Sequence, residues 1–236
     1  MYFFSFKAFA PAASFRVPEA HIFQQSLPLP PITTLKGLVG AAAGFSFEEV
    51  LKFCEENKLR FGVIGQHRGR AKDLWKYRKV KSGEVISAVL IREFLFDLDL
   101  EVFIAAEDKD IVEKIRNDFL NPVYALCAGP SDCLMKVKNI SLVMDGTIGD
   151  ATNFAYTVLP GDLTGLYEVD IDLKSIPLLQ EIYVPRVFLL PTSFDFSGAE
   201  RRVKERKHFT FVDVPVTLKK PVEALLLDDK KAVPLL

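Results

Sequence analysis

The order of strand-like and helix-like segments, a long basic interruption among them and a β-rich final third predict an α+β fold for this 236-residue chain. Residues 1–145 follow the order strand, helix, strand, excursion, strand, helix, strand, which is typical of a ferredoxin-like or RNA-recognition-type domain. Residues 146–236 alternate apolar and polar positions without a long helical pattern, so we expect a smaller β-rich module there. A hydrophobic content of 49% and a charged content of 26% are consistent with a folded globular protein.

The N-terminal elements are predicted from periodicity and capping residues. Residues 1–9 alternate and are rich in aromatic side chains, as a buried strand would be. Four prolines in residues 17–31 then predict an extended, irregular segment. Thr33 and Thr34 directly precede an amphipathic pattern that ends at Gly44, so we expect a short helix capped by a threonine hydroxyl.

The remaining elements are assigned in the same way. Their expected order is a helix from Ser46 to about Glu56, a short strand at 60–65, a basic excursion near 66–84, strand sequence over 84–106 interrupted near 97–99, a helix from Asp108 or Asp110 to Asn121, and strand-like segments at 123–127 and 133–142. Ser46 and Glu49 form a capping box at the start of the second helix. A turn-rich stretch at 143–153 predicts the domain boundary. Beyond it, alternating segments lie at 167–173, 181–190 and 207–216.

Charge is distributed unevenly along the chain. The formal net charge of −1 alone does not suggest a nucleic-acid-binding protein. Seven Lys or Arg against one Asp lie between Arg68 and Lys81, however, and five against one Glu lie between Arg201 and Lys207. A mildly acidic body therefore carries two concentrated basic segments.

The first basic segment is the stronger candidate for binding nucleic acid. It interleaves cations with Trp75, the only Trp of the chain, and with Tyr77. Cations neutralise phosphates and aromatic faces accept unstacked bases, so this mixture suits single-stranded nucleic acid better than duplex. A solvated hairpin tip is the alternative interpretation. For residues 201–208 the two interpretations are balanced, because Glu200 and Glu205 can pair with the cations.

Other candidate residues give weaker signals. Thr33, Thr34 and Lys36 lie at a predicted helix N-terminus, where free amides attract phosphate, although ordinary capping explains the same pattern. His67 lies in the basic segment, and His208 follows Lys207. Either histidine is a fallback candidate for the base of a metal-independent ribonuclease, but a histidine among cations is more often a phosphate or stacking contact.

The sequence predicts no metal or cofactor site. Cys54, Cys127 and Cys133 form an odd set without a Cys-x-x-Cys pair, which fits a reducing cytoplasm. No stretch approaches the length of a membrane-spanning helix. Walker, dinucleotide-binding and zinc-protease motifs are also missing from the sequence.

Several motifs together resemble the fifth core family of CRISPR-associated (Cas) proteins, within the RAMP superfamily. Phe15-Arg16 and the run from Pro31 through Thr33, Thr34 and Gly37-Leu38 to Gly44 resemble the opening of that family. Two stretches further along the chain also resemble this family. Arg92-Glu93-Phe94-Leu95 resembles its "Arg-Glu-Tyr-Leu" strand, and residues 124–132 resemble its "Leu-Gly-Arg-Ser" turn. Pro130 stands where an arginine is common. The resemblance covers residues 1 to about 140.

The resemblance implies a ferredoxin-like RAMP fold whose β-hairpin "thumb" clamps the 5′ handle of CRISPR RNA. It implies a place at one end of the type I surveillance complex Cascade, a ribonucleoprotein of antiviral defence, beside the backbone subunit and the large subunit. Residues 68–81 fall where the thumb belongs. The expected RNA contacts are Arg16, Thr33, Thr34, Lys36, His67, Arg68, Arg70, Lys72, Trp75, Lys76, Tyr77, Arg78, Lys79, Lys81 and Ser131.

A member of the type I-C branch of this family cuts the precursor RNA without metal, using a Tyr, a Lys and an adjacent His. The only Lys-His pair here is Lys207-His208, outside the region of resemblance. We therefore favour binding without cutting, with a metal-independent endoribonuclease that processes CRISPR repeat RNA as the alternative.

Overall fold

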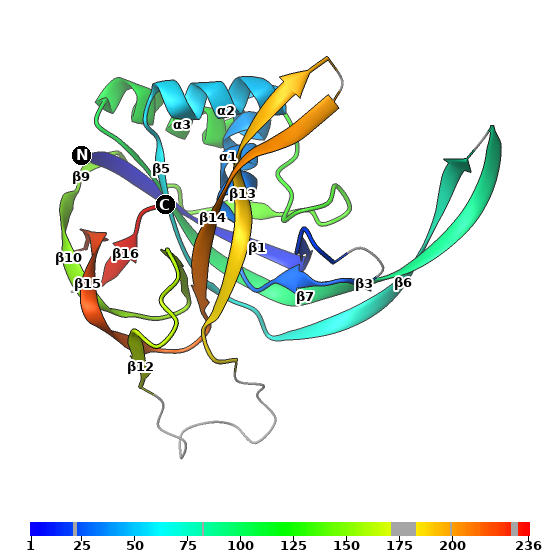
Figure 1. The fold of residues 1–236 in the computed structure, drawn as a ribbon. Coiled ribbons are helices and arrows are strands. Elements are labelled where there is room, and N and C mark those ends of the chain that lie inside the picture. Colours follow the sequence, from blue (N-terminus) through cyan, green and yellow to red (C-terminus); the bar gives the residue numbers. More distant parts are fainter. Residues whose placement is uncertain (21–22, 82, 171–182, 199, 228–230) are drawn as a thin grey trace.

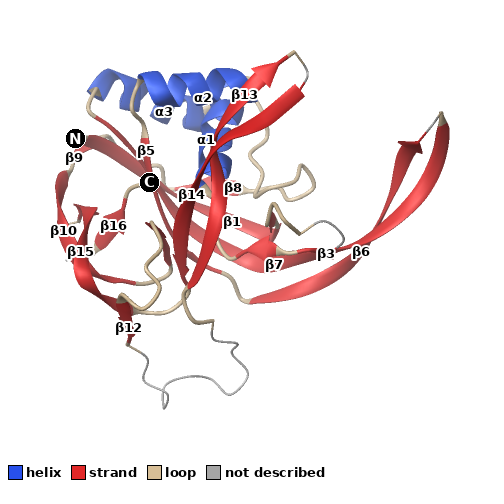
Figure 2. Ribbon diagram, viewed as in Figure 1, coloured by secondary structure: helices blue, strands red, loops and turns tan. Residues whose placement is uncertain are grey.

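A computed structural model provides the structure of the chain (Figure 1). The description covers residues 1–20, 23–81, 83–170, 183–198, 200–227 and 231–236, without the side chains of Lys79 and Lys81. Strands form most of the described structure and three helices gather on one side of them (Figure 2). Within the described ranges, no helix is long and apolar enough to cross a membrane.

One large antiparallel sheet organises the fold. Its central path is β13 (Arg186–Ser197), β14 (Glu200–Val212), β11 (Thr157–Pro160), β5 (Arg60–Gln66), β7 (Glu84–Ala106), β1 (Tyr2–Ala13) and β8 (Lys136–Lys138). Three more strands pair outside this path: β3 (Phe23–Gln24) and β6 (Gly69–Lys81) with β7, and β9 (Met144–Asp145) with β1. Only β3 runs parallel to its partner. Strands from the C-terminal third therefore continue the sheet of the N-terminal part.

A smaller sheet comes entirely from the C-terminal third. It contains β10 (Thr147–Phe154), β15 (Val216–Leu226), β12 (Tyr167–Val169) and β16 (Ala232–Pro234). A separate two-stranded ribbon pairs β2 (Phe15–Arg16) with β4 (Ser26–Leu27). The domain boundary near residue 145 remains a prediction, because residues beyond it contribute strands to the main sheet as well as to the smaller sheet.

The three helices cover one face of the main sheet with apolar side chains. They are α1 (Ile32–Ala43), α2 (Phe47–Glu56) and α3 (Lys109–Leu120). The rings of Phe6 in β1 and Phe119 in α3 have centroids 4.6 Å apart, and both side chains are buried. Such packing is expected because every second residue of β1 points toward the helices.

The opposite face is partly covered by the C-terminal sheet. Phe3 and Phe103 of the main sheet form a buried cluster with Leu225, Val233 and Leu235. Gly62 lies under this contact, since a Cβ atom there would come within 2.5 Å of Val233. The two sheets are thus joined by a close-packed apolar interface.

The helix caps confirm one prediction and correct another. The Ser46 hydroxyl accepts a hydrogen bond from the Glu49 amide, and the Glu49 carboxylate accepts one from the Ser46 amide. Asp108 caps α3 in a similar way. The expected threonine cap of α1 is wrong, because α1 begins at Ile32 after Pro31, so that Thr33 and Thr34 lie within the helix, and its N-terminus receives no side-chain hydrogen bond.

Two strand predictions also differ from the structure, and two more can be compared only in part. Residues 123–127 form no strand beyond a single bridge from Cys127 to Leu134, because the amides of Val123 and Tyr124 donate to carbonyls at the end of α1. Residues 207–216 are divided between β14 and β15 instead of forming one segment. Part of the predicted segments 167–173 and 181–190 lies outside the described residues.

Candidate nucleic-acid interface

The basic excursion is a long β-hairpin that leaves the body of the protein (Figure 1). We call β6 together with residues 84–96 of β7 the first hairpin. All 13 residues of β6 pair with this half of β7, from Gly69 opposite Phe96 to Lys81 opposite Glu84. Pairing between β5 and the inner half of β7 has the same register and stops at Gln66 opposite Asp99. The first hairpin therefore extends the central strand pair beyond the sheet.

The break between the two halves lies at Asp97. This residue adopts a left-handed backbone with φ of 45°, which is unusual for a residue with a side chain. On the far edge of β7, Asp97 lies opposite Pro11, which has no amide hydrogen to donate, and the two form no pair. The interruption expected near 97–99 is thus the point where the pairing partner of β7 changes from β5 to β6.

Alternation along β6 places the predicted residues on two faces. Arg70, Lys72, Lys76 and Arg78 share one face, and Trp75 and Tyr77 share the other, because successive strand residues point in opposite directions. Residues directly opposite each other in an antiparallel pair share a face, so Leu90, opposite Trp75, lies on the aromatic face. The hairpin thus has a cationic face and an aromatic face.

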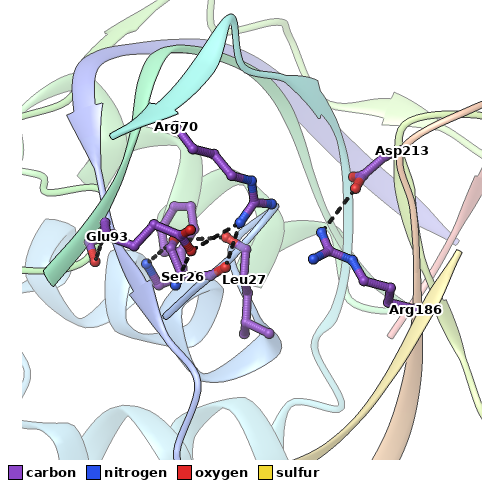
Figure 3. A network of polar contacts seen from close by, with 8 residues as sticks. Ser26, Leu27, Arg70, Glu93, Arg186 and Asp213 are labelled. Atoms are coloured by element: carbon purple, nitrogen blue, oxygen red, sulfur yellow. Dashed lines mark hydrogen bonds and ion pairs between the residues drawn. The ribbon is translucent and has the colours of Figure 1, made fainter. Parts of the chain in front are cut away.

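A buried ion pair fixes the root of the cationic face (Figure 3). Arg70 Nη1 donates to Glu93 Oε2 at 3.1 Å, and the two side chains are only 10% and 14% exposed. The same guanidinium donates to the carbonyl of Ser26, and the Ser26 amide donates to Glu93. Arg70 therefore joins the hairpin to the β2–β4 ribbon.

A second buried ion pair lies beside the first. Arg186 in β13 donates to Asp213 at 3.2 Å (Figure 3). The guanidinium groups of Arg70 and Arg186 lie 4.8 and 4.7 Å from the ring centre of Tyr183. Burial raises the pKa of the Asp213 carboxyl group, although Arg186 opposes that shift. The hairpin root and the C-terminal strands thus meet in one charged cluster.

His67 lies at the edge of this cluster. Burial, reinforced by the positive charge of Arg70, lowers the pKa of His67 to about 4, so the imidazole is neutral at pH 7. Its Nδ1 atom is buried and has no hydrogen-bond partner among the described residues. His67 therefore supplies no positive charge for a phosphate at neutral pH.

A third ion pair, between Arg92 and Asp132, packs against the aromatic face of the hairpin. Arg92, whose side chain is 7% exposed, binds both carboxylate oxygens of Asp132 at 2.7 and 3.4 Å. This hydrogen bonding lowers the pKa of Asp132. The Arg92 guanidinium also lies 5.0 Å from the ring of Trp75 and 4.2 Å from the ring of Phe94. Cation–π contacts of this kind hold an aromatic ring in a fixed orientation.

Trp75 remains accessible although it is supported in this way. Its side chain is 40% exposed, and its ring centre lies 5.7 Å from that of Tyr77. The two rings form a platform on which an unstacked base can lie. Ser131 is exposed in the turn beside Asp132, so the structure brings this predicted contact close to the platform.

The remaining cations of the basic segment differ in how many contacts they form. Lys76 and Arg78 are exposed and form no ion pair with any described residue. Arg68 lies 3.7 Å from Asp97 at the surface, and Lys72 lies over the ring of Phe23. Lys79 and Lys81 belong to β6, but their side chains lie outside the description.

The remaining predicted residues lie outside the first hairpin, although Arg16 pairs with Ser26, which the hairpin root contacts. Thr33, Thr34 and Lys36 lie on α1, and Lys36 lines a cleft with Lys204 and Lys207 of β14. Arg16 is exposed on β2. Sequence reasoning assigned no role to Asp132, and it noted Arg92 and Glu93 only as part of a motif. Arg92 and Glu93 point to opposite faces of the hairpin root, where Arg92 pairs with Asp132 and Glu93 pairs with Arg70.

The comparisons with known proteins come from sequence families and from solved structures. Residues 3–169 match the family described as "CRISPR-associated protein (Cas_Cas5)". No curated protein sequence matches the chain. The fold is similar to a chain of a "CRISPR RNA-guided surveillance complex", with a TM-score of 0.56 and 14% identity over 93% of this chain and 91% of that one.

Two further solved structures share the fold. A CRISPR protein from Archaeoglobus fulgidus matches with a TM-score of 0.54 and 11% identity over 99% of both chains. A chain of the type III-B Cmr-beta complex bound to cognate target RNA and AMPPnP matches with a TM-score of 0.50 and 10% identity, over 93% of this chain and 86% of that one. At these identities the similarity concerns the fold, a mixed and mostly β architecture.

Proposed function

Because this chain belongs to the Cas5 family of CRISPR-associated proteins, we propose that it is a non-catalytic RNA-binding subunit of a type I CRISPR surveillance complex. In this proposal the first hairpin grips the 5′ handle of the CRISPR RNA and the subunit caps one end of Cascade. Its neighbours there are the backbone subunit and the large subunit.

The observation that carries the proposal is the outer part of the first hairpin. Lys76 and Arg78 project from one face without a carboxylate partner, while Trp75 and Tyr77 form an aromatic platform on the other. Free cations neutralise phosphates, and a supported aromatic ring accepts an unpaired base. A strand of RNA crossing the hairpin would meet both.

The arrangement of the central strands supports a ferredoxin-like assignment. Strands β5, β7, β1 and β8 are adjacent in that order, and the helices of the N-terminal part connect them on one face. We infer the strand–helix–strand plan of the RAMP superfamily for residues 1–145, with residues 146–236 as an added β-rich module. The first hairpin is then an outward extension of β5 and β7, the second and third strands of this plan along the chain.

Binding without cleavage is favoured by the positions of the histidines. A ribonuclease base must reach the 2′-hydroxyl, whereas Nδ1 of His67 is buried beside Arg70. His208 is exposed, but Lys207 and His208 are successive residues of β14 and point to opposite faces. The two side chains therefore cannot act on one phosphate.

The test is the salt dependence of binding to an RNA that contains the 5′ handle. For a single strand, the slope of log K against log salt is about −0.7 for each phosphate neutralised. Replacing Lys76 and Arg78 by Ala should make the slope shallower by about 1.4, whereas replacing Lys52 and Lys109, exposed on α2 and α3, should not change it. An unchanged slope in the first variant would remove the hairpin from the proposal.

Cleavage is tested separately. The purified protein is incubated with repeat RNA in EDTA, and the expected result is intact RNA. Cleavage that is lost in His67→Ala or His208→Ala would establish the endoribonuclease alternative instead.

A further inference from the structure

A basic cleft lies on the helix side of β13 and β14. It has a volume of about 650 Å³ and lies between these strands, α1, α2 and the residues that follow α2. Four lysines that are distant in the sequence meet around it: Lys36, Lys58, Lys204 and Lys207. We call it the lysine cleft.

The carboxylates in the lysine cleft only partly balance these ammonium groups. Its lining contains Glu55 and Glu205. Glu205 is already engaged, because it accepts a hydrogen bond from the Thr192 hydroxyl at 3.2 Å and lies 3.6 Å from Lys207. Lys204 lies 3.9 Å from Asp195, outside the cleft lining. Lys36 and Lys58 form no ion pair with any part of the chain that the structure describes. The cleft therefore has an excess of positive charge.

Lys58 has an unusual backbone conformation for a lysine. It follows the C-terminal end of α2 with φ of 48°, in the left-handed region that helices usually fill with glycine. Its amide donates to the Glu55 carbonyl, and the next amide, of Leu59, donates back to Cys54. A lysine at this position costs conformational energy that glycine would not.

We propose that the lysine cleft binds the phosphodiester backbone of a single-stranded nucleic acid, at a site separate from the first hairpin. Lysine is a point charge suited to phosphate, and it is depleted from protein–protein interfaces. Phe194 is the one aromatic residue of the lining, so we expect the cleft to bind the phosphates of the strand without distinguishing its bases. Its volume is that of a site enclosing a small ligand, which suits about one or two nucleotides of a strand and not a duplex.

The experiment uses the full chain with Lys76→Ala and Arg78→Ala, so that these two exposed cations of the first hairpin are absent from every variant compared. The probe is a labelled 15-nucleotide oligouridylate, which contains no handle, and its affinity is measured by fluorescence anisotropy between 50 and 300 mM KCl. Replacing all four cleft lysines by Gln should make the salt slope shallower by about 2 to 3. Lys52→Gln on α2, outside the cleft, is the matched control and should leave the slope unchanged.

Lys58→Gly separates binding from folding. Since glycine relieves the left-handed strain, the thermal unfolding midpoint should stay equal or rise, while the salt slope becomes shallower by about 0.7. An unchanged slope in the four-lysine variant overturns the proposal, and so does an unchanged slope in Lys58→Gly. Equal binding of a 15-base-pair duplex would overturn the single-strand assignment. Displacement of the probe by oligoglutamate at equal concentration would assign the cleft to an acidic protein segment instead. None of these outcomes depends on the grip of the hairpin on the handle.

Discussion

Two hairpins of this protein carry concentrated positive charge, and they use it differently. In the first hairpin, Lys76 and Arg78 have no carboxylate partner among the described residues. In the second hairpin, formed by β13 and β14, most cations pair with acids of the same chain: Arg202 with Glu200, Lys204 with Asp195, Arg206 with Glu19 and Lys207 with Glu205. Local charge in a sequence is therefore a weaker indicator of a nucleic-acid grip than charge left unpaired after folding.

The difference comes from the partner strand. Opposite Lys76 and Arg78, β7 places Val89 and Ser87, so no acid lies directly opposite these two cations. Opposite Arg202, β13 places Asp195, and Glu200 and Glu205 are interspersed in β14 itself. Exposed apolar side chains such as Leu74 (69%), Val80 (71%) and Val85 (63%) also gather on the first hairpin. Such a surface is typical of an interface.

The largest expected effect tests the buried root of the first hairpin. Glu93→Gln removes the negative charge beside the buried Arg70, which should cost about 3–5 kcal/mol of the free energy of unfolding. Glu200→Gln, in the exposed tip of the second hairpin, should cost less than about 1 kcal/mol. Urea unfolding of both variants provides the measurement, and equal costs would contradict the distinction between a buried root and a solvated tip.

A smaller effect is expected for the aromatic platform. Trp75→Ala should weaken handle RNA binding by about 1–3 kcal/mol if a base stacks on the indole. Phe196→Ala in the second hairpin should leave this binding unchanged, because Phe196 packs against Phe47 and lies outside the lysine cleft. Isothermal titration with the handle RNA distinguishes the two. No loss with Trp75→Ala would mean that its role is to pack on Arg92.

His67 predicts a pH dependence of stability. Its folded pKa of about 4 lies below the unfolded value of 6.5, so below pH 6.5 the unfolded chain binds a proton that the folded chain does not. Stability should therefore fall as the pH drops from 6.5 to 4, by about 1–2 kcal/mol after allowance for solvent screening. Urea unfolding of His67→Gln against the wild type isolates this contribution. Parallel pH profiles would contradict the burial of the imidazole.

The smallest effect is expected at the tip of the second hairpin. Arg202 is 81% exposed and already pairs with Glu200 at 3.1 Å. Arg202→Ala should therefore change handle RNA affinity by less than about twofold, since an exposed ion pair contributes at most about 1 kcal/mol. Filter binding at fixed salt suffices, and a tenfold loss would show that the second hairpin also grips the handle.

Local features of this fold are predictable from the sequence, and distant pairings are not. The Ser46 capping box, the Gly44 helix end and the long basic excursion depend on neighbouring residues, and the structure contains all three. The Arg70–Glu93 pair joins residues 23 positions apart on two strands, so it depends on the hairpin register. The meeting of Lys36 with Lys204 requires the complete sheet topology.

The candidate site shows the same limit. Composition identified the cations and the aromatic residues of β6, but it did not separate Arg70, which is buried, from Arg78, which is exposed. That separation follows from distance along the hairpin, because residues near the root pack against the β2–β4 ribbon and residues near the tip meet solvent. The amino-acid type alone does not show whether a residue lies near the root or near the tip of the hairpin.

The most direct test of the central claim is crosslinking at single-nucleotide resolution. Handle RNA carrying 4-thiouridine at one position at a time is irradiated with the protein, and the attached residues are identified by mass spectrometry. Adducts concentrated on β6, with Trp75 and Tyr77 among them, are the predicted result. Adducts confined to the helices or to the C-terminal sheet, with none on β6, would contradict the proposed grip.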